Sequence, residues 1–188
     1  MADNIARWRD EHFRFATLLG VVERQLDRFH SGEQPDYALA LDVMRYMNGY
    51  PDRCHHPQED VAFERVAARE PAHAGAIAAL LEEHEEIDRS GERLVQLFEE
   101  VLDDAVLSRE QVEQPGRAYI RLLRDHMRRE EEFFERAASV LDASDWAAIE
   151  RAVPLESDPL VAAEGNEDFA SLRALVSRAA AGRIPISA

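Results

Sequence analysis

Two stretches of this sequence repeat one pattern, HHPQEDVAFER at residues 55–65 and HMRREEEFFER at residues 126–136. Both read H-x3-E-x3-F-E-R, with His55 and Glu59 in the first and His126 and Glu130 in the second. Residues four apart lie on one face of an α-helix, so each pair directs an imidazole and a carboxylate to the same point. Each block therefore predicts a helix that carries half of a metal site.

Four segments with apolar residues at three- and four-residue spacing contain these blocks, which is typical of amphipathic helices. They cover approximately residues 5–30, 36–69, 73–104 and 108–141. Short turns between consecutive helices force neighbours to run antiparallel. The sequence thus predicts an all-α protein whose residues 1–141 form an up-down-up-down four-helix bundle.

Proline and glycine residues mark two places where these helices should be irregular. Gly49, Pro51 and Pro57 surround His55, which predicts a bend in a second helix that is otherwise continuous. Pro115 leaves open whether the fourth helix begins before this residue or restarts at it.

Residues 142–188 are predicted to form a C-terminal helical extension packed on the bundle. A short helix through Trp146 should be followed by a polar connector over residues 153–158 and a last helix around residues 167–181. Because this extension contains no histidine, we expect it to supply packing or dimer contacts and no chemistry.

Two further histidines, His12 and His84, lie within the apolar stripes of the first and third segments. His12 lies roughly 18 residues before the first turn and His55 roughly 19 after it, so the two reach similar depths in an antiparallel pair. A lone inward histidine is more often a hydrogen-bonded core residue than a ligand. Four at one level, with an inward glutamate beside two of them, would be buried without partners unless a metal binds them.

The donor types indicate which metal would fit. Imidazole suits iron, copper and zinc, whereas carboxylate suits harder ions, so mixed nitrogen and oxygen donors inside a helical bundle favour iron or manganese over zinc. The single cysteine, Cys54, excludes a cysteine-rich cluster built from this chain alone.

Other polar residues near the pattern are given different roles. His56, Asp60 and Glu131 lie one residue from a predicted ligand, about 100° around the helix, so we expect them to support the ligands from outside or to face solvent. His30 and His73 lie near helix ends, where capping or solvated roles are commoner.

Composition excludes several classes of function. The formal net charge of −16 would repel a phosphate backbone, so we expect no nucleic-acid partner. The chain shows neither a signal-like amino terminus nor a long apolar span, so we expect a cytoplasmic protein without a membrane partner. A homodimer is left open.

Across residues 5–141 the sequence resembles the hemerythrin-like family, the HHE cation-binding domain. The matching pieces are Asp10-Glu11-His12, the HHPQED block, Glu83-His84-Glu85 and the block from His126 to Glu130. This resemblance implies a four-helix bundle that holds two iron ions joined by an oxo or hydroxo group. The two glutamates would also bridge the ions, and the histidines would be terminal ligands. Manganese or zinc is less favoured.

The sequence departs from the family pattern in two ways. Oxygen carriers of the family add a fifth histidine through an H-x3-H pair, but Leu80 and Asp88 stand four residues either side of His84, which disfavours simple oxygen carriage. The family also often has Leu-Phe-Pro after each H-x3-E, and this chain has Ala-Phe-Glu and Phe-Phe-Glu, so the helices should extend further.

The resemblance favours a di-iron protein that binds O2 or related small species, such as NO or peroxide, in stress response or iron homeostasis. One alternative is an enzyme that turns over peroxide or NO. Another is an iron donor for repair of iron–sulfur clusters, and a third is a metal-free helical interaction module. The sequence does not decide whether the protein is an enzyme.

Overall fold

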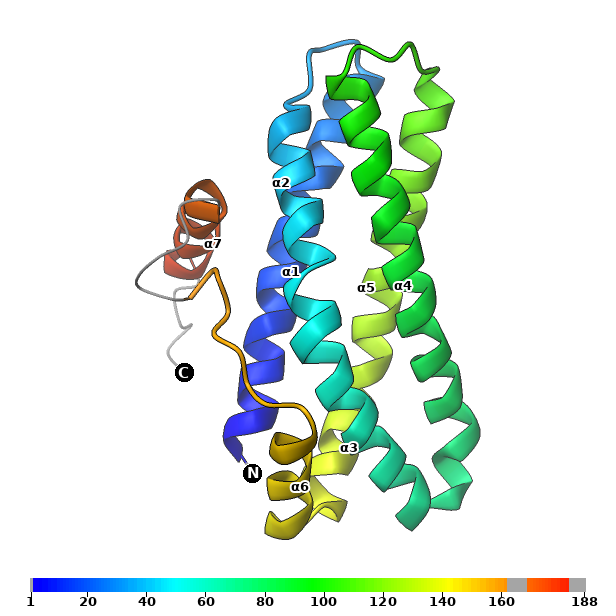
Figure 1. Ribbon diagram of the computed structural model, residues 1–188, viewed down its shortest axis with the longest axis vertical. Coiled ribbons are helices and arrows are strands. Elements are labelled where there is room, and N and C mark those ends of the chain that lie inside the picture. Colours follow the sequence, from blue (N-terminus) through cyan, green and yellow to red (C-terminus); the bar gives the residue numbers. More distant parts are fainter. Residues whose placement is uncertain (1, 162–168, 183–188) are drawn as a thin grey trace.

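The computed structural model describes residues 2–161 and 169–182. Every regular element in these residues is a helix, so the chain is all-α as its periodicity predicts (Figure 1). None of the described helices combines the length and the apolar composition that crossing a bilayer requires.

Four long helical segments lie side by side along the molecule (Figure 1). In chain order they are α1 (Ala2–His30), then α2 (Tyr37–Met47) with the π-helix η1 (Pro51–His55) and α3 (His56–Arg69), then α4 (Ala74–Leu102), and α5 (Arg109–Val140). The loops after α1 and α4 lie at the top of Figure 1, and the 3-10 turn η2 (Pro71–His73) between α3 and α4 lies at the bottom. All four segments therefore pass the middle of the molecule, where their side chains can meet.

The ends of the helices are fixed by side chains that satisfy free backbone groups. The carboxylate of Asp36 accepts a hydrogen bond from the Leu39 amide at 2.9 Å. Ser108 and Gln111 form a capping box, in which each side chain bonds the other residue's backbone N–H. This box starts α5 at Arg109, and the helix then continues through Pro115.

The second segment is not the continuous helix that the sequence predicts. It is interrupted by a turn at residues 48 and 49, between α2 and η1. A Cβ atom on Gly49 would lie 2.9 Å from the Arg45 carbonyl oxygen, so this turn needs glycine. In η1 the N–H of His56 bonds the carbonyl of Pro51, a wider turn than that of an α-helix. His55 is the last residue of η1, so the wider turn lies directly before the first H-x3-E pair.

Two apolar clusters fill the interior above and below a polar layer. One cluster includes Phe15, Leu19 and Leu123, and the other includes Trp8 and Phe134. The predicted ligands fall between these clusters along each helix. Burial of the apolar side chains provides the main stabilisation on both sides of the layer.

The two C-terminal helices pack at different heights: α6 (Ala143–Ala152) joins the lower apolar cluster through Trp146 and Ile149, and α7 (Ala170–Ala181) joins the upper one through Leu172 and Val176 (Figure 1). Helix α6 contacts α3, where Arg65 pairs with Asp145 at 3.0 Å, and Trp146 lies 5.6 Å from Trp8 between ring centroids. Helix α7 contacts α1. Residues 167 and 168 of the predicted last helix lie outside the described residues, and the division of the chain at residue 141 stays a prediction.

Candidate metal centre

The six predicted ligands come together in two groups of three. The first is His12, His55 and Glu59, and the second is His84, His126 and Glu130. Within each group one donor atom of every residue lies within 4.8 Å of the others, and all six side chains are buried. The four long segments therefore bring the predicted residues to one layer, as expected from their matched distances to the turns.

The repeated H-x3-E blocks form equivalent halves of this layer. His55 Nε2 lies 3.1 Å from Glu59 Oε1, and His126 Nε2 lies 3.0 Å from Glu130 Oε1. Both pairs span one helical turn, the geometry that the four-residue spacing predicts.

The two groups touch through the glutamates. His12 Nε2 lies 3.7 Å from Glu59 Oε1 and 3.4 Å from Glu130 Oε2. His84 Nε2 lies 3.2 Å from Glu130 Oε1 and 3.9 Å from Glu59 Oε2. Each glutamate therefore reaches histidines of both groups, as a carboxylate that bridges two ions must.

Several ligand atoms of the layer lack hydrogen bonds, and a bound cation would satisfy them. Both carboxylate oxygens of Glu59, Oε2 of Glu130 and Nε2 of His126 are buried without a hydrogen-bond partner among the described residues. Leaving a buried polar group unpaired typically costs about 1–3 kcal/mol, and more when it is charged. A pair of cations coordinated by these atoms would satisfy them, so the residues fit a two-metal centre.

The outer nitrogens of three of these histidines are held by carboxylates from other helices. The contacts are His55 Nδ1 with Glu11 at 2.7 Å, His84 Nδ1 with Asp60 at 2.6 Å, and His126 Nδ1 with Glu83 at 3.0 Å. A carboxylate on Nδ1 fixes the ring and leaves Nε2 for a metal. Such contacts are usual for metal-binding histidines.

Sequence reasoning assigned no role to Glu11 or Glu83. Each directly precedes a predicted histidine ligand on its own helix, and that position was the available signal. Tyr50 donates a hydrogen bond to Glu11 at 2.8 Å and so holds this carboxylate in turn. Burial is the largest effect and would raise the pKa of Glu11, but the hydrogen bonds with His55 and Tyr50 and the charges of His55 and Arg7 together lower it below its ordinary value.

The pKa values of the two buried glutamates are shifted in opposite directions. Burial raises the pKa of Glu59 well above its ordinary value, and the nearby carboxylate of Glu130 raises it further. Burial acts the same way on Glu130, but contacts with His126, His12 and His84 outweigh it and lower its pKa well below the ordinary value. In the metal-free protein, ionisation is thus less favourable for Glu59 than for Glu130.

His56 lies against the centre without joining either group. Its ring stacks on that of His84, with centroids 4.4 Å apart and planes inclined by 14°. A ring nitrogen binds a metal in the plane of its ring, so an ion in the plane of His84 lies outside the plane of His56. His56 Nδ1 lies 3.0 Å from Asp52. Burial raises the pKa of Asp52 to about 7, and its neighbour Asp88 adds to the effect.

The remaining candidates lie away from the layer. Glu131 pairs with Arg9 at 3.0 Å on the surface, whereas Asp60 supports His84 as described. His30 is exposed near the end of α1 beside Glu113, and His73 lies at the start of α4. Glu131, His30 and His73 belong to neither of the two groups of candidate ligands.

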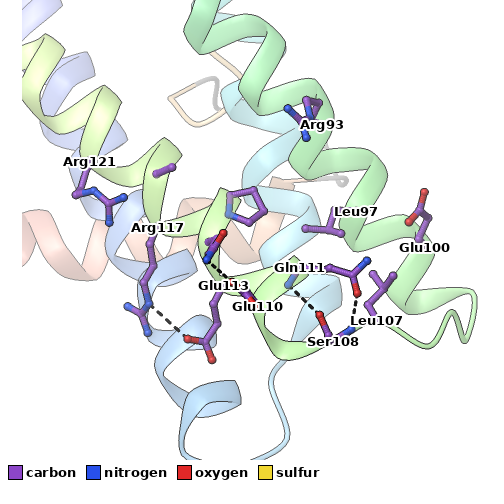
Figure 2. Close-up of a pocket in the computed structure, with 13 residues that line it drawn as sticks. Arg93, Leu97, Glu100, Leu107, Ser108, Glu110, Gln111, Glu113, Arg117 and Arg121 are labelled. Carbon is purple, nitrogen blue, oxygen red and sulfur yellow. Dashed lines mark hydrogen bonds and ion pairs between the residues drawn. The ribbon is translucent and has the colours of Figure 1, made fainter.

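A separate groove of about 1000 Å³ lies between α4 and α5, close to the loop that joins them (Figure 2). Figure 2 shows Arg117 directed toward Glu113, and Ser108 and Gln111 closing their capping box. None of the six converging residues lines this groove. The candidate chemistry therefore belongs to the buried layer.

Comparison with known families gives a match. The model of the Hemerythrin HHE cation binding domain matches residues 3–137, a span that covers well over half of the 188 residues and contains all six residues of the layer. Searches of curated proteins and of solved structures gave no significant match. The chain therefore belongs to the hemerythrin HHE cation-binding domain family.

Proposed function

We propose that this chain is a non-haem di-iron protein of up-down-up-down bundle architecture. Its six ligands are His12, His55, Glu59, His84, His126 and Glu130, and Glu59 and Glu130 bridge the two ions. The observation that carries the proposal is the pair of three-residue groups, whose glutamates contact histidines on both sides and whose buried donor atoms lack other partners.

Iron is the preferred metal because the donors are nitrogen and oxygen. Cys54 is buried but belongs to the apolar cluster, so no thiolate of the described residues competes in either group. Six ligands shared between two ions leave open coordination positions, which a purely structural site lacks. When bound, the iron pair would supply a redox-active centre with room for a small molecule.

The protein's own side chains set the environment of that small molecule. Phe15 lies 5.0 Å from the ring of His55, and Phe134 lies 5.0 Å from that of His12. These rings keep bulk water from the donors, while Glu11, Asp60 and Glu83 orient three imidazoles. A dry, oriented and open site suits reversible binding of O2, NO or peroxide, and we infer a cytoplasmic role in stress response or iron homeostasis.

Metal analysis of the purified protein tests the proposal first. We expect two irons per chain in wild type, and the same content in His30→Ala and His73→Ala, whose histidines lie outside both groups. Fewer than one ion per chain would overturn the proposal and favour a helical interaction module.

Optical spectroscopy then separates binding from turnover. A binding protein gives an adduct spectrum with O2 or NO that reverses when the ligand is removed under argon. Consumption of peroxide or NO over many cycles would instead support the enzymatic alternative.

A further inference from the structure

The carboxylates that hold the histidines follow one rule along the bundle. Each stands next to a ligand on its own helix and reaches a histidine that another segment supplies. Thus Glu11 on α1 holds the histidine at the end of η1, Asp60 on α3 holds the histidine of α4, and Glu83 on α4 holds the histidine of α5.

The rule fails at His12. By the sequence repeat, Glu131 occupies in α5 the place that Asp60 occupies in α3. Its carboxylate pairs instead with Arg9 at 3.0 Å, where the two side chains are 45% and 41% exposed. His12 Nδ1 makes no hydrogen bond to any residue within 2–161 or 169–182, and the polar contacts of this ring all run through Nε2. His12 is thus the one predicted ligand histidine without a carboxylate behind it.

This difference separates the two halves of the centre. In the group of His84 and His126, both imidazoles have a carboxylate on Nδ1. In the other group only His55 has one. A carboxylate in this position fixes the ring and raises the basicity of the metal-binding nitrogen, and its loss typically lowers metal affinity about 10–100-fold.

We propose that the two ions are inequivalent, and that the ion held by His12, His55 and Glu59 is the labile one. It leaves first and is the ion that the protein exchanges. This inference rests on the proposed di-iron centre, and it assigns the exchangeable position to a particular half of it.

Anaerobic release of Fe2+ to excess ferrozine tests the proposal, because the coloured complex counts the ions as they leave. From wild type we expect two phases of one ion per chain each, with rates that differ about 10–100-fold. Release of both ions in one phase overturns the inequivalence. Fewer than one ion per chain at the start would instead mean that the di-iron proposal has failed.

Isosteric variants assign the phases to the two groups. Glu11→Gln should accelerate only the fast phase, and Glu83→Gln should accelerate the slow phase and bring the two rates together. Glu131→Gln is the matched control and should change neither. Acceleration of the fast phase by Glu83→Gln, with the slow phase unchanged, would reverse the assignment and overturn the proposal.

A further variant, at a more exposed carboxylate, tests the same role with less risk of disturbing the fold. Asp60 is 40% exposed at its side chain, so Asp60→Asn should be tolerated by the fold, which far-UV circular dichroism checks. It should accelerate the slow phase as Glu83→Gln does. A folded Asp60→Asn protein with an unchanged slow phase would contradict the role given to these carboxylates.

Discussion

Glu59 and Glu130 occupy the same place in the sequence repeat, yet we predict that replacing each by glutamine shifts the stability of the metal-free protein in opposite directions. Glu59 is fully buried, neither of its carboxylate oxygens accepts a hydrogen bond from a described residue, and its pKa is raised. Glu59→Gln keeps the shape and removes the charge, which should stabilise the folded state at pH 8 by about 1–3 kcal/mol. For a chain of this size the melting temperature should rise by about 2–12 °C.

Glu130 lies 3.0 Å from His126, 3.2 Å from His84 and 3.4 Å from His12, and these contacts lower its pKa. Removing one partner from a buried set of charged contacts typically costs about 3–5 kcal/mol. Glu130→Gln should therefore lower the melting temperature of the metal-free protein by about 6–20 °C.

Thermal unfolding of chelator-treated protein, followed by circular dichroism at pH 8 and pH 5, measures both effects. A raised carboxyl pKa means that stability is lost as pH rises from the ordinary toward the raised value, so protonated Glu59 at pH 5 resembles glutamine. The gain from Glu59→Gln should thus shrink at pH 5. A lower melting temperature for Glu59→Gln at pH 8, or shifts of the same sign for both variants, would refute the reasoning.

Three further predictions concern the surroundings of the layer and the centre itself. Burial and the neighbouring Asp88 raise the pKa of Asp52 to about 7, so the contribution of Asp52 to the free energy of unfolding falls as pH rises from about 4 to 7. Asp52→Asn should therefore reduce the dependence of the free energy of unfolding on pH, as measured by denaturant unfolding. An unchanged pH dependence would contradict this prediction. Trp8 is fully buried against Phe134 and Trp146, so Trp8→Ala should cost about 3–5 kcal/mol in the same assay, and a cost below about 1 kcal/mol would speak against this packing. Ligating imidazoles must be neutral, so iron should be released below about pH 6, as metal analysis after dialysis can show; full retention at pH 4 would contradict nitrogen ligation.

The residues of the layer could be predicted because their signals are local. The pairs His55–Glu59 and His126–Glu130 need only the four-residue spacing of a helix, and that spacing can be recognised without knowing how the helices pack against one another. His12 could be placed at the same depth because short turns fix how far each helix runs. That these residues bind metal stays a prediction.

The sequence predicts that residues such as Asp60 and Glu131 either support a ligand or face solvent, but it could not decide between the two, because the outcome depends on how one helix is rotated against the next. Asp60 and Glu131 hold equivalent places in the repeat, but the first faces His84 and the second faces Arg9. The interruption at Gly49 was missed for a related reason. Glycine and proline signal irregularity, but whether the turn tightens or widens depends on backbone contacts, such as the hydrogen bond that the Gly49 N–H donates to the Tyr46 carbonyl.

The carboxylate–imidazole contacts across the layer have a consequence for the alignment of the helices. The attraction between the apolar side chains above and below it is not directional, so it does not by itself determine which polar groups face one another. Hydrogen bonds of 2.6–3.0 Å between neighbouring segments permit one relative height only. Displacing α4, or the segment of η1 and α3, by one turn would separate two of these pairs at once, and displacing α1 or α5 would separate one. The residues that form the candidate metal site therefore also favour a single relative height of the four segments.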